Sequence, residues 1–332
     1  MVSFASLVMI LTAMTVSFLV TFYLVPLVIS IALRFNIVDN PDGKLKQHKK
    51  PTPYLGGIAI YIGFLCSLAM FFPFEGTFAL FFIGITLLFF VGLLDDLNPL
   101  SPLQKFVGQG LAAFCFLKAG FYLKEHFFTW LLGIPLSYFW ILTVINAFNL
   151  VDIMDGLATT ISFGSAFSFM VMALYFGQPH VALLFAILIG SLVAFFYYNK
   201  PQASIYLGDA GSLFLGGIFA ATPFLMPWGT NTVYGFFAPV IILAIPLLEL
   251  GFLIIVRTMK GIPFYLGSPD HFAIVLQKKG WSRQAILGGC LVVSSLLCLV
   301  ALLFLSGALS LVSVVALGAV FAVIVGCWLH LF

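Results

Sequence analysis

The chain has 332 residues, of which 63% are hydrophobic and only 8% are charged, and its formal net charge is +3. No soluble domain of this length could bury so much apolar surface, so the composition excludes a soluble protein and predicts an all-α protein that crosses a membrane several times. The five cysteines lie in apolar runs without CxxC spacing, which argues against disulfides or a zinc site. We expect one transmembrane domain over residues 1–332, with membrane lipids as partners and no bound nucleic acid.

Apolar runs of about 20 residues predict eleven transmembrane helices, beginning near residues 5, 56, 77, 105, 133, 158, 181, 211, 235, 284 and 310. Counting these spans places the loops at 35–55, 95–104, 152–157, 198–210 and 257–283 on one side of the membrane. Of the 14 Lys and Arg, all except Lys118 and Lys124 lie in these loops or directly next to them. The positive-inside rule therefore makes that side cytoplasmic. We expect a multi-pass protein of the inner (cytoplasmic) membrane, with its N-terminus outside, its C-terminus inside and its active site on the cytoplasmic face.

The first of these loops, residues 39–57, is basic and rich in Pro and Gly. One interpretation is a loop that sets the topology and touches lipid headgroups. The other adds phosphate binding by Lys44, Lys46 and His48. The two interpretations are compatible, and these three side chains are candidate substrate-binding residues.

Asp95 and Asp96 directly follow an apolar run. Ser101 and Pro102 have the pattern of a helix start, with an N-cap followed by the first turn, so Lys105 should lie one turn inside the next helix. Adjacent carboxylates repel, so such a pair is either fully solvated or offset by a cation and a Lys side chain. Because other acidic groups occur at similar boundaries, we favour the cation.

The polar residues Asn146, Asn149, Asp152 and Asp155 interrupt the fifth apolar run at a spacing of three. If this run is helical, that spacing keeps all four on one broad face. The simplest reason to hold several carboxylates together is a bound divalent cation with phosphates. This stretch is therefore the predicted centre of the active site.

A third acidic group is Gly208-Asp209-Ala-Gly-Ser212. Glycine allows close backbone approach, and a helix that starts near Ser212 would offer free N–H groups to a phosphate. A simple helix cap is the alternative interpretation of this short pattern.

The last loop carries signals for an amphipathic interfacial helix, opened by Ser268 and Pro269 and closed by Gly280. His271 would stand in its first turn, and we place it among the candidate catalytic residues. Glu249 lies inside the preceding apolar run, where we expect a structural hydrogen bond to a neighbouring span.

Together these motifs resemble those of the polyprenyl-phosphate N-acetylhexosamine-1-phosphate transferases, membrane enzymes that start cell-wall and surface-glycan lipid intermediates. The resemblance is closer to the branch that uses UDP-N-acetylglucosamine and undecaprenyl phosphate than to the muramyl-pentapeptide branch. It extends from about Asp39 to about Arg283. The matching motifs are Gly56-Gly57, Asp95-Asp96 with Lys105, Asn146-Ala-Phe-Asn149-Leu-Val-Asp152-x-x-Asp155-Gly156-Leu157, Gly208-Asp209-x-Gly211-Ser212, and Pro246-x-x-Glu249 leading into Arg257.

The resemblance implies transfer of a sugar 1-phosphate from a UDP-N-acetylhexosamine to a polyprenyl phosphate, with release of UMP. The pathway would be cell-wall, lipopolysaccharide or other surface-polysaccharide synthesis. It implies a Mg²⁺ requirement, with Mn²⁺ as an alternative. Asp209 and Asn149 would lie close to the metal. Asp95 and Asp96 would activate or orient the lipid phosphate, and Lys105 would neutralise phosphate charge. Asp152 and Asp155 would line the uridine and sugar side. Further substrate-binding candidates are Asn146, Gly156 and Ser212.

Two positions depart from the family pattern, and the first of them bears on specificity. Ala273-Ile274-Val275-Leu276 replaces a His-rich patch, which disfavours the muramyl-pentapeptide branch, and Ile153 stands where the family usually has Gly. An inactive lipid-binding relative is one rival interpretation. A secondary transporter is another, but the chain shows no internal repeat or pair of broken helices. The oligomeric state is open, and a homodimer is one option.

Overall fold

A computed structural model of the protein describes residues 4–39, 51–73, 77–124, 130–230, 234–263 and 268–319. In these ranges nearly all regular structure is helical, and the strands there are two short antiparallel ones, which confirms the all-α prediction. The chain divides into two compact units, Met1–Met226 and Pro227–Phe332. That residues 1–332 act as one domain stays a prediction.

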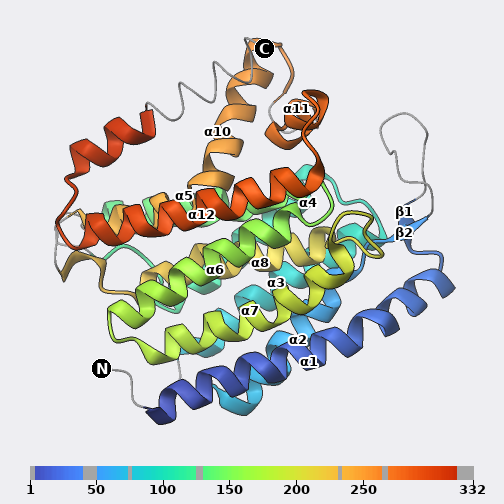
Figure 1. Cartoon of the computed structure of the whole chain (residues 1–332), viewed down its shortest axis with the longest axis horizontal. Coiled ribbons are helices and arrows are strands. Elements are labelled where there is room, and N and C mark those ends of the chain that lie inside the picture. The colour runs from blue at the N-terminus through green and yellow to red at the C-terminus, as the bar shows by residue number, and fades with distance from the viewer. Residues whose placement is uncertain are drawn as a thin grey trace. The chain divides into compact units, whose positions relative to one another are not determined.

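The described part of the first unit is a bundle of eight α-helices built from the long apolar runs (Figure 1). Such runs become helices in a membrane because a helix satisfies its backbone hydrogen bonds internally. The strands β1 and β2 follow the end of α1. The elements are α1 Phe4–Arg34, β1 Val38–Asp39, β2 Thr52–Pro53, α2 Gly56–Phe71, α3 Thr77–Leu97, α4 Pro102–Lys118, α5 Trp130–Leu150, α6 Leu157–Tyr175, α7 Pro179–Asn199, α8 Gly208–Ala221 and the 3-10 helix η1 Thr222–Leu225.

α8 lies in the interior of this unit (Figure 1) and carries Asp209 in its first turn. Its residues from Ala210 to Ala221 are buried, and it contacts α2, α3, α5 and α6. Close approach to α8 depends on glycine: a Cβ at Gly92 in α3 would lie 2.2 Å from the carbonyl oxygen of Asp209. On α2, a Cβ at Gly57 would lie 2.2 Å from the backbone nitrogen of Gly211. The backbone of α8 is thus held against two neighbours that cannot carry larger residues at these positions.

α7 packs against α1, α2 and α6, and buried hydroxyl groups join it to α1. The Oγ atoms of Ser17 and Ser191 lie 2.5 Å apart, and the Thr21 hydroxyl donates to Ser191 Oγ at 3.1 Å. All three side chains are fully buried. Hydroxyl groups that bond between helices satisfy polar atoms inside an apolar bundle. These hydrogen bonds fix α7 against α1, and α7 leads into the segment that precedes α8.

The second unit combines one long helix, residues 283–305, with several short elements. Its α9 and α10 meet at Leu243, where the helical path from Gly235 to Met259 bends by 74°. A transporter built from discontinuous helices has such breaks in corresponding positions of two halves, whereas the described residues contain this single bent pair. The elements are η2 Trp228–Thr230, η3 Gly235–Phe237, α9 Ala238–Ile242, α10 Ala244–Met259, α11 Phe272–Lys278 and α12 Arg283–Leu305, followed by helical residues 311–319.

A helix begins within about three residues of each of the eleven predicted starts. Six described helices are long and apolar enough to cross a membrane, or seven if the bent pair is one span. The protein is therefore a multi-pass membrane protein. The number of crossings and the orientation of the termini stay predictions.

Candidate active site

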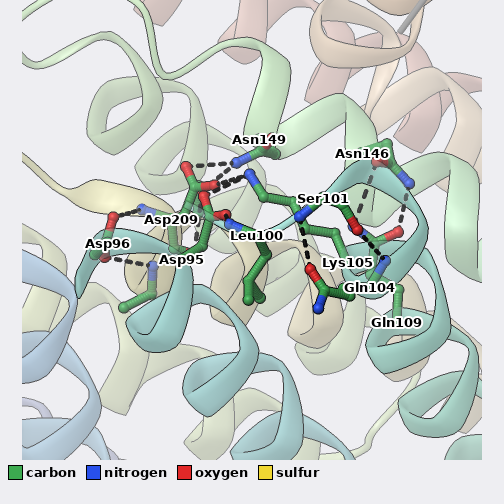
Figure 2. Close-up of polar contacts among 12 residues, drawn as sticks. Asp95, Asp96, Leu100, Ser101, Gln104, Lys105, Gln109, Asn146, Asn149 and Asp209 are labelled. Atoms are coloured by element: carbon green, nitrogen blue, oxygen red, sulfur yellow. Dashed lines mark hydrogen bonds and ion pairs between the residues drawn. The ribbon is translucent and has the colours of Figure 1, made fainter. Parts of the chain in front are cut away.

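Three charged residues from distant parts of the first unit meet at the ends of their helices (Figure 2). Asp95 lies in the last turn of α3, Lys105 in the first turn of α4, and Asp209 in the first turn of α8. Lys105 Nζ lies 2.5 Å from Asp95 Oδ2 and 2.6 Å from Asp209 Oδ2. Their side chains are partly exposed. Two carboxylates thus face the same ammonium group, as the predicted grouping of the acidic motifs requires.

The start of α4 fixes the position of Lys105. The Gln104 N–H donates to Ser101 Oγ at 3.3 Å, and the Ser101 N–H donates to Gln104 Oε1 at 2.8 Å, so the two residues form a capping box. The Leu100 N–H donates to Asp95 Oδ1 at 2.7 Å. The predicted helix start at Ser101 and Pro102 is confirmed, and Lys105 lies one turn inside the helix.

Asn149, near the end of α5, connects that helix to the first turn of α8 (Figure 2). Its Nδ2 donates to Asp209 Oδ1 at 3.0 Å and to Ser212 Oγ at 2.9 Å. Asp209 therefore receives Lys105 on one carboxylate oxygen and Asn149 on the other. Ser212, a predicted substrate-binding residue, contacts Asn149.

Asp96 differs from its neighbour Asp95, because its carboxylate caps α8. Asp96 Oδ1 accepts from the Asp209 N–H at 2.8 Å, and Oδ2 accepts from the Ala210 N–H at 3.0 Å. The helix begins at Gly208, four residues before the start expected near Ser212. The prediction that its first N–H groups are open to a phosphate is wrong for Asp209 and Ala210, since Asp96 accepts from both.

Asp152 lies in the segment 151–156 that joins α5 to α6, outside the apolar helices. Burial, followed by the charge of Asp209, raises the pKa of Asp152 to about 7, and the charge of Asp155 adds to the increase. The N–H of Gly208 donates to the carboxylate and partly offsets this rise in pKa. A carboxyl group with this pKa is able to hold or release a proton near neutral pH.

Asp155 and its neighbours organise the segment between α7 and α8. Asp155 Oδ2 accepts from the N–H groups of Gln202 at 3.1 Å and Ala203 at 3.4 Å. Asn199 Nδ2 donates to the Ile205 carbonyl at 2.9 Å. Gly156 is the N-cap of α6 with φ +75°, a conformation that favours glycine. These contacts hold in place the chain segment that precedes Asp209. The predicted substrate contacts of Asp155 and Gly156 stay predictions.

Asn146 points to a residue that sequence reasoning missed, Gln109 in α4 (Figure 2). Asn146 Nδ2 donates to Gln109 Oε1 at 2.8 Å and to the Leu142 carbonyl at 2.8 Å. Gln109 is only 3% exposed. A lone amide one helical turn after Lys105, on the same face, is the signal that could have identified it.

Lys44, Lys46 and His48 lie outside the described residues, but the end of the same loop is described. The Tyr206 N–H donates to the Pro53 carbonyl at 2.7 Å, and the N–H groups of Gly56 and Gly57 donate to the carbonyls of Tyr206 and Leu207 at 2.9 and 2.8 Å. The Gly pair therefore binds the backbone just before Asp209.

His271 lies in the second unit, buried beside Glu249. The distance from His271 Nδ1 to Glu249 Oε1 is 2.9 Å, and the Phe272 N–H donates to the same oxygen at 3.3 Å. Glu249 makes the expected structural hydrogen bonds, but their location was predicted wrongly, because the partner is the start of α11 and not a neighbouring span. That helix begins at Phe272 with His271 as its N-cap, so the predicted start at Ser268 and Pro269 is also wrong.

Comparison with known proteins identifies the family. Residues 78–226 match the model of glycosyl transferase family 4. A probable undecaprenyl-phosphate N-acetylglucosaminyl 1-phosphate transferase of Bacillus subtilis is 32% identical over 287 residues, which cover 84% of this chain and 80% of that protein. The chain belongs to glycosyl transferase family 4. A phospho-N-acetylmuramoyl-pentapeptide-transferase of Listeria monocytogenes is 32% identical over 252 residues, covering 67% of this chain and 76% of the relative.

The stretch that matches family 4 contains the whole side-chain cluster of the first unit, from Asp95 to Asp209. It ends before Glu249 and His271. The cluster therefore lies in the part of the chain that defines the family, and the protein is a phospho-sugar transferase.

The donor atoms of the cluster fit a magnesium ion. Among the described residues, no three His, Cys, Asp or Glu side chains converge as a complete metal site. Mg²⁺ is commonly bound through one or two carboxylates together with substrate phosphates, and it prefers oxygen ligands. Asp95 and Asp209 meet this requirement, because both carboxylates already approach one positive charge, the Lys105 ammonium.

Proposed function

We propose that this protein transfers N-acetylhexosamine 1-phosphate from a UDP-sugar to undecaprenyl phosphate and releases UMP, as the first membrane step of cell-wall or surface-polysaccharide synthesis. The observation that carries the proposal is the position of Lys105 between Asp95 and Asp209, at the ends of three helices of an apolar bundle. A charged cluster at helix ends can meet a water-soluble nucleotide and a lipid phosphate at the same membrane surface. We place that surface on the cytoplasmic side.

UDP-N-acetylglucosamine is the sugar donor that we propose. The Bacillus relative, whose name specifies N-acetylglucosamine, covers 84% of this chain, whereas the Listeria pentapeptide transferase covers 67%. The stretch Ala273-Ile274-Val275-Leu276 also offers only apolar side chains after His271. A short apolar stretch lacks the hydrogen-bonding groups that a larger polar substrate would need.

The reaction needs positioning and charge neutralisation more than a strong base. An oxygen of the lipid phosphate forms a bond to the sugar-bearing phosphorus while the bond from that phosphorus to the bridging oxygen breaks, and UMP leaves with the bridging oxygen. Lys105 would neutralise phosphate charge, and Asp152 would hold or accept a proton near neutral pH. Direct attack is our preferred route over a covalent aspartyl phosphate, because a phosphate monoester is already a nucleophile.

Asp209 and Asp95 are the residues that would hold Mg²⁺, with Asn149 fixing the orientation of Asp209 through its bond to Oδ1. When bound, the ion would neutralise charge on the pyrophosphate and stabilise the leaving group. Because Lys105 approaches the same oxygens, the two cations would share the cluster once substrate phosphates add negative charge.

A transfer assay with purified protein, radiolabelled UDP-N-acetylglucosamine, undecaprenyl phosphate and Mg²⁺ tests the proposal. We expect label in the chloroform-extractable lipid and an equal amount of UMP. Asp209→Asn should reduce turnover by at least a hundredfold while the protein still purifies as a folded species. Label that stays on the protein without lipid product would indicate an inactive lipid-binding relative instead.

A further inference from the structure

Asp95 and Asp96 are adjacent in sequence but contact different groups (Figure 2). Asp95 faces Lys105 through Oδ2 and accepts from the Leu100 N–H through Oδ1. Asp96 uses both oxygens on the first turn of α8, accepting from the N–H groups of Asp209 and Ala210. Successive residues of a helix point about 100° apart, so one helix can present two carboxylates with separate roles.

The first turn of α8 has no room for a side chain at Gly208. Gly208 has φ +76°, and a Cβ there would lie 2.3 Å from the Tyr54 carbonyl oxygen and 2.7 Å from Asp96 Oδ2. Gly92 lies one helical turn before Asp96 in α3 and approaches the Asp209 carbonyl so closely that a Cβ would collide. Asp96 therefore meets α8 where α3 already touches its backbone.

We propose that Asp96 is a positioning residue that fixes Asp209 by capping α8, and that its carboxylate touches neither substrate. A carboxylate at a helix N-terminus satisfies N–H groups that have no partner within the helix and interacts favourably with the helix dipole. Both its oxygens are directed at these N–H groups, while Asp209 turns its side chain to Lys105 and Asn149. The consequence for Mg²⁺ binding rests on the proposed function.

Hydrogen exchange in metal-free, detergent-solubilised protein tests the cap directly. Asp96→Ala should speed exchange in the peptide that covers residues 206–214 on the order of tenfold, while exchange in α7 stays unchanged as a control for the fold. Asp95→Ala should leave that peptide unaffected, because Asp95 accepts no N–H of α8. Should Asp96→Ala fail to fold, Asp96→Asn, which keeps one acceptor oxygen, should give a smaller increase. Unchanged exchange in a folded Asp96 variant would overturn the proposal.

A kinetic measurement separates positioning from contact with substrate. Asp96→Asn should raise the Mg²⁺ concentration needed for half-maximal rate by about 10–100-fold, the usual effect of losing a group that orients a ligand. At saturating Mg²⁺ its kcat should return to within about tenfold of the wild-type value, and KM for undecaprenyl phosphate should not change; Asp95→Asn should stay impaired at any Mg²⁺ concentration. If kcat of Asp96→Asn stays low at every Mg²⁺ concentration, Asp96 contacts substrate and the proposal is wrong. A wild-type protein without transferase activity would refute the proposed function, while the exchange result would still decide whether Asp96 holds α8.

Discussion

Replacing Asp152 by Asn should stabilise the metal-free protein above neutral pH. The pKa of Asp152 is about 7 in the folded protein and 3.8 in its ordinary state. Because the folded-state pKa is raised, folding disfavours the ionised carboxyl group. The cost begins above pH 3.8, grows as the pH rises, and is complete above about pH 7. Asn carries no charge and still offers an oxygen to the N–H of Gly208.

The magnitude follows from the difference of about three pH units between the two pKa values, at 1.36 kcal/mol for each. Ionised Asp152 therefore costs at most about 4 kcal/mol, less whatever its partial exposure recovers. Each kcal/mol shifts the melting temperature by about 2–4 °C in a domain of 150–250 residues. We expect Asp152→Asn to melt up to roughly 10 °C higher than the wild-type protein at pH 8.5.

Thermal unfolding in detergent with a chelator, measured from pH 5 to 8.5, checks this prediction. The advantage of the variant should grow up to about pH 7 and then stay constant. Asp270→Asn is a control of opposite sign, because the hydrogen bond from the Lys260 ammonium lowers the pKa of Asp270, so losing its charge should destabilise slightly. An Asp152→Asn advantage that is absent, or equal at every pH, would refute the reasoning. The variant should also lose transferase activity, as expected where a functional site stores unfavourable charge.

Three further substitutions follow from the packing and charge of the first unit. Lys105→Met should lower kcat by about a hundredfold or more in the transfer assay, because it removes the positive charge between two carboxylates; a rate near wild type would exclude Lys105 from the site. Gly92→Ala should cost about 1–3 kcal/mol of stability by forcing a Cβ into the backbone of α8, whereas Gly251→Ala, which meets nothing within 4 Å, should be nearly neutral; equal melting temperatures would contradict this. Gln109→Leu should cost about 1–3 kcal/mol by removing the Gln109 side chain from the buried Asn146 amide, which keeps only the Leu142 carbonyl as acceptor, and adding Asn146→Leu should restore most of the loss; a double variant no more stable than the single one would show that the pair is not the cause.

The sequence predicted those features of the fold and of the site that depend on local patterns. Apolar run lengths placed the helix starts, and Ser101 with Pro102 placed Lys105, because caps and hydrophobic runs depend on neighbouring residues. The predicted topology placed the loops with Asp95, Lys105 and Asp209 on the same side of the membrane. On that basis the sequence predicted that these three residues lie close together.

What the sequence did not predict depends on contacts between distant segments. Adjacent aspartates look alike in a sequence, so the capping role of Asp96 required the position of α8. Likewise, Glu249 and His271 are 22 residues apart, and no local pattern indicated that the carboxylate would bond to the start of α11.

A double-mutant cycle on Lys105 and Asp209, measured as transfer of labelled sugar phosphate to undecaprenyl phosphate, tests most directly whether these residues act as one site. Because their side chains touch at 2.6 Å, we expect Lys105→Ala and Asp209→Asn each to remove nearly all activity and the double variant to lose little more. Losses that multiply in the double variant would show that the two residues act independently and would contradict a shared phosphate-binding centre.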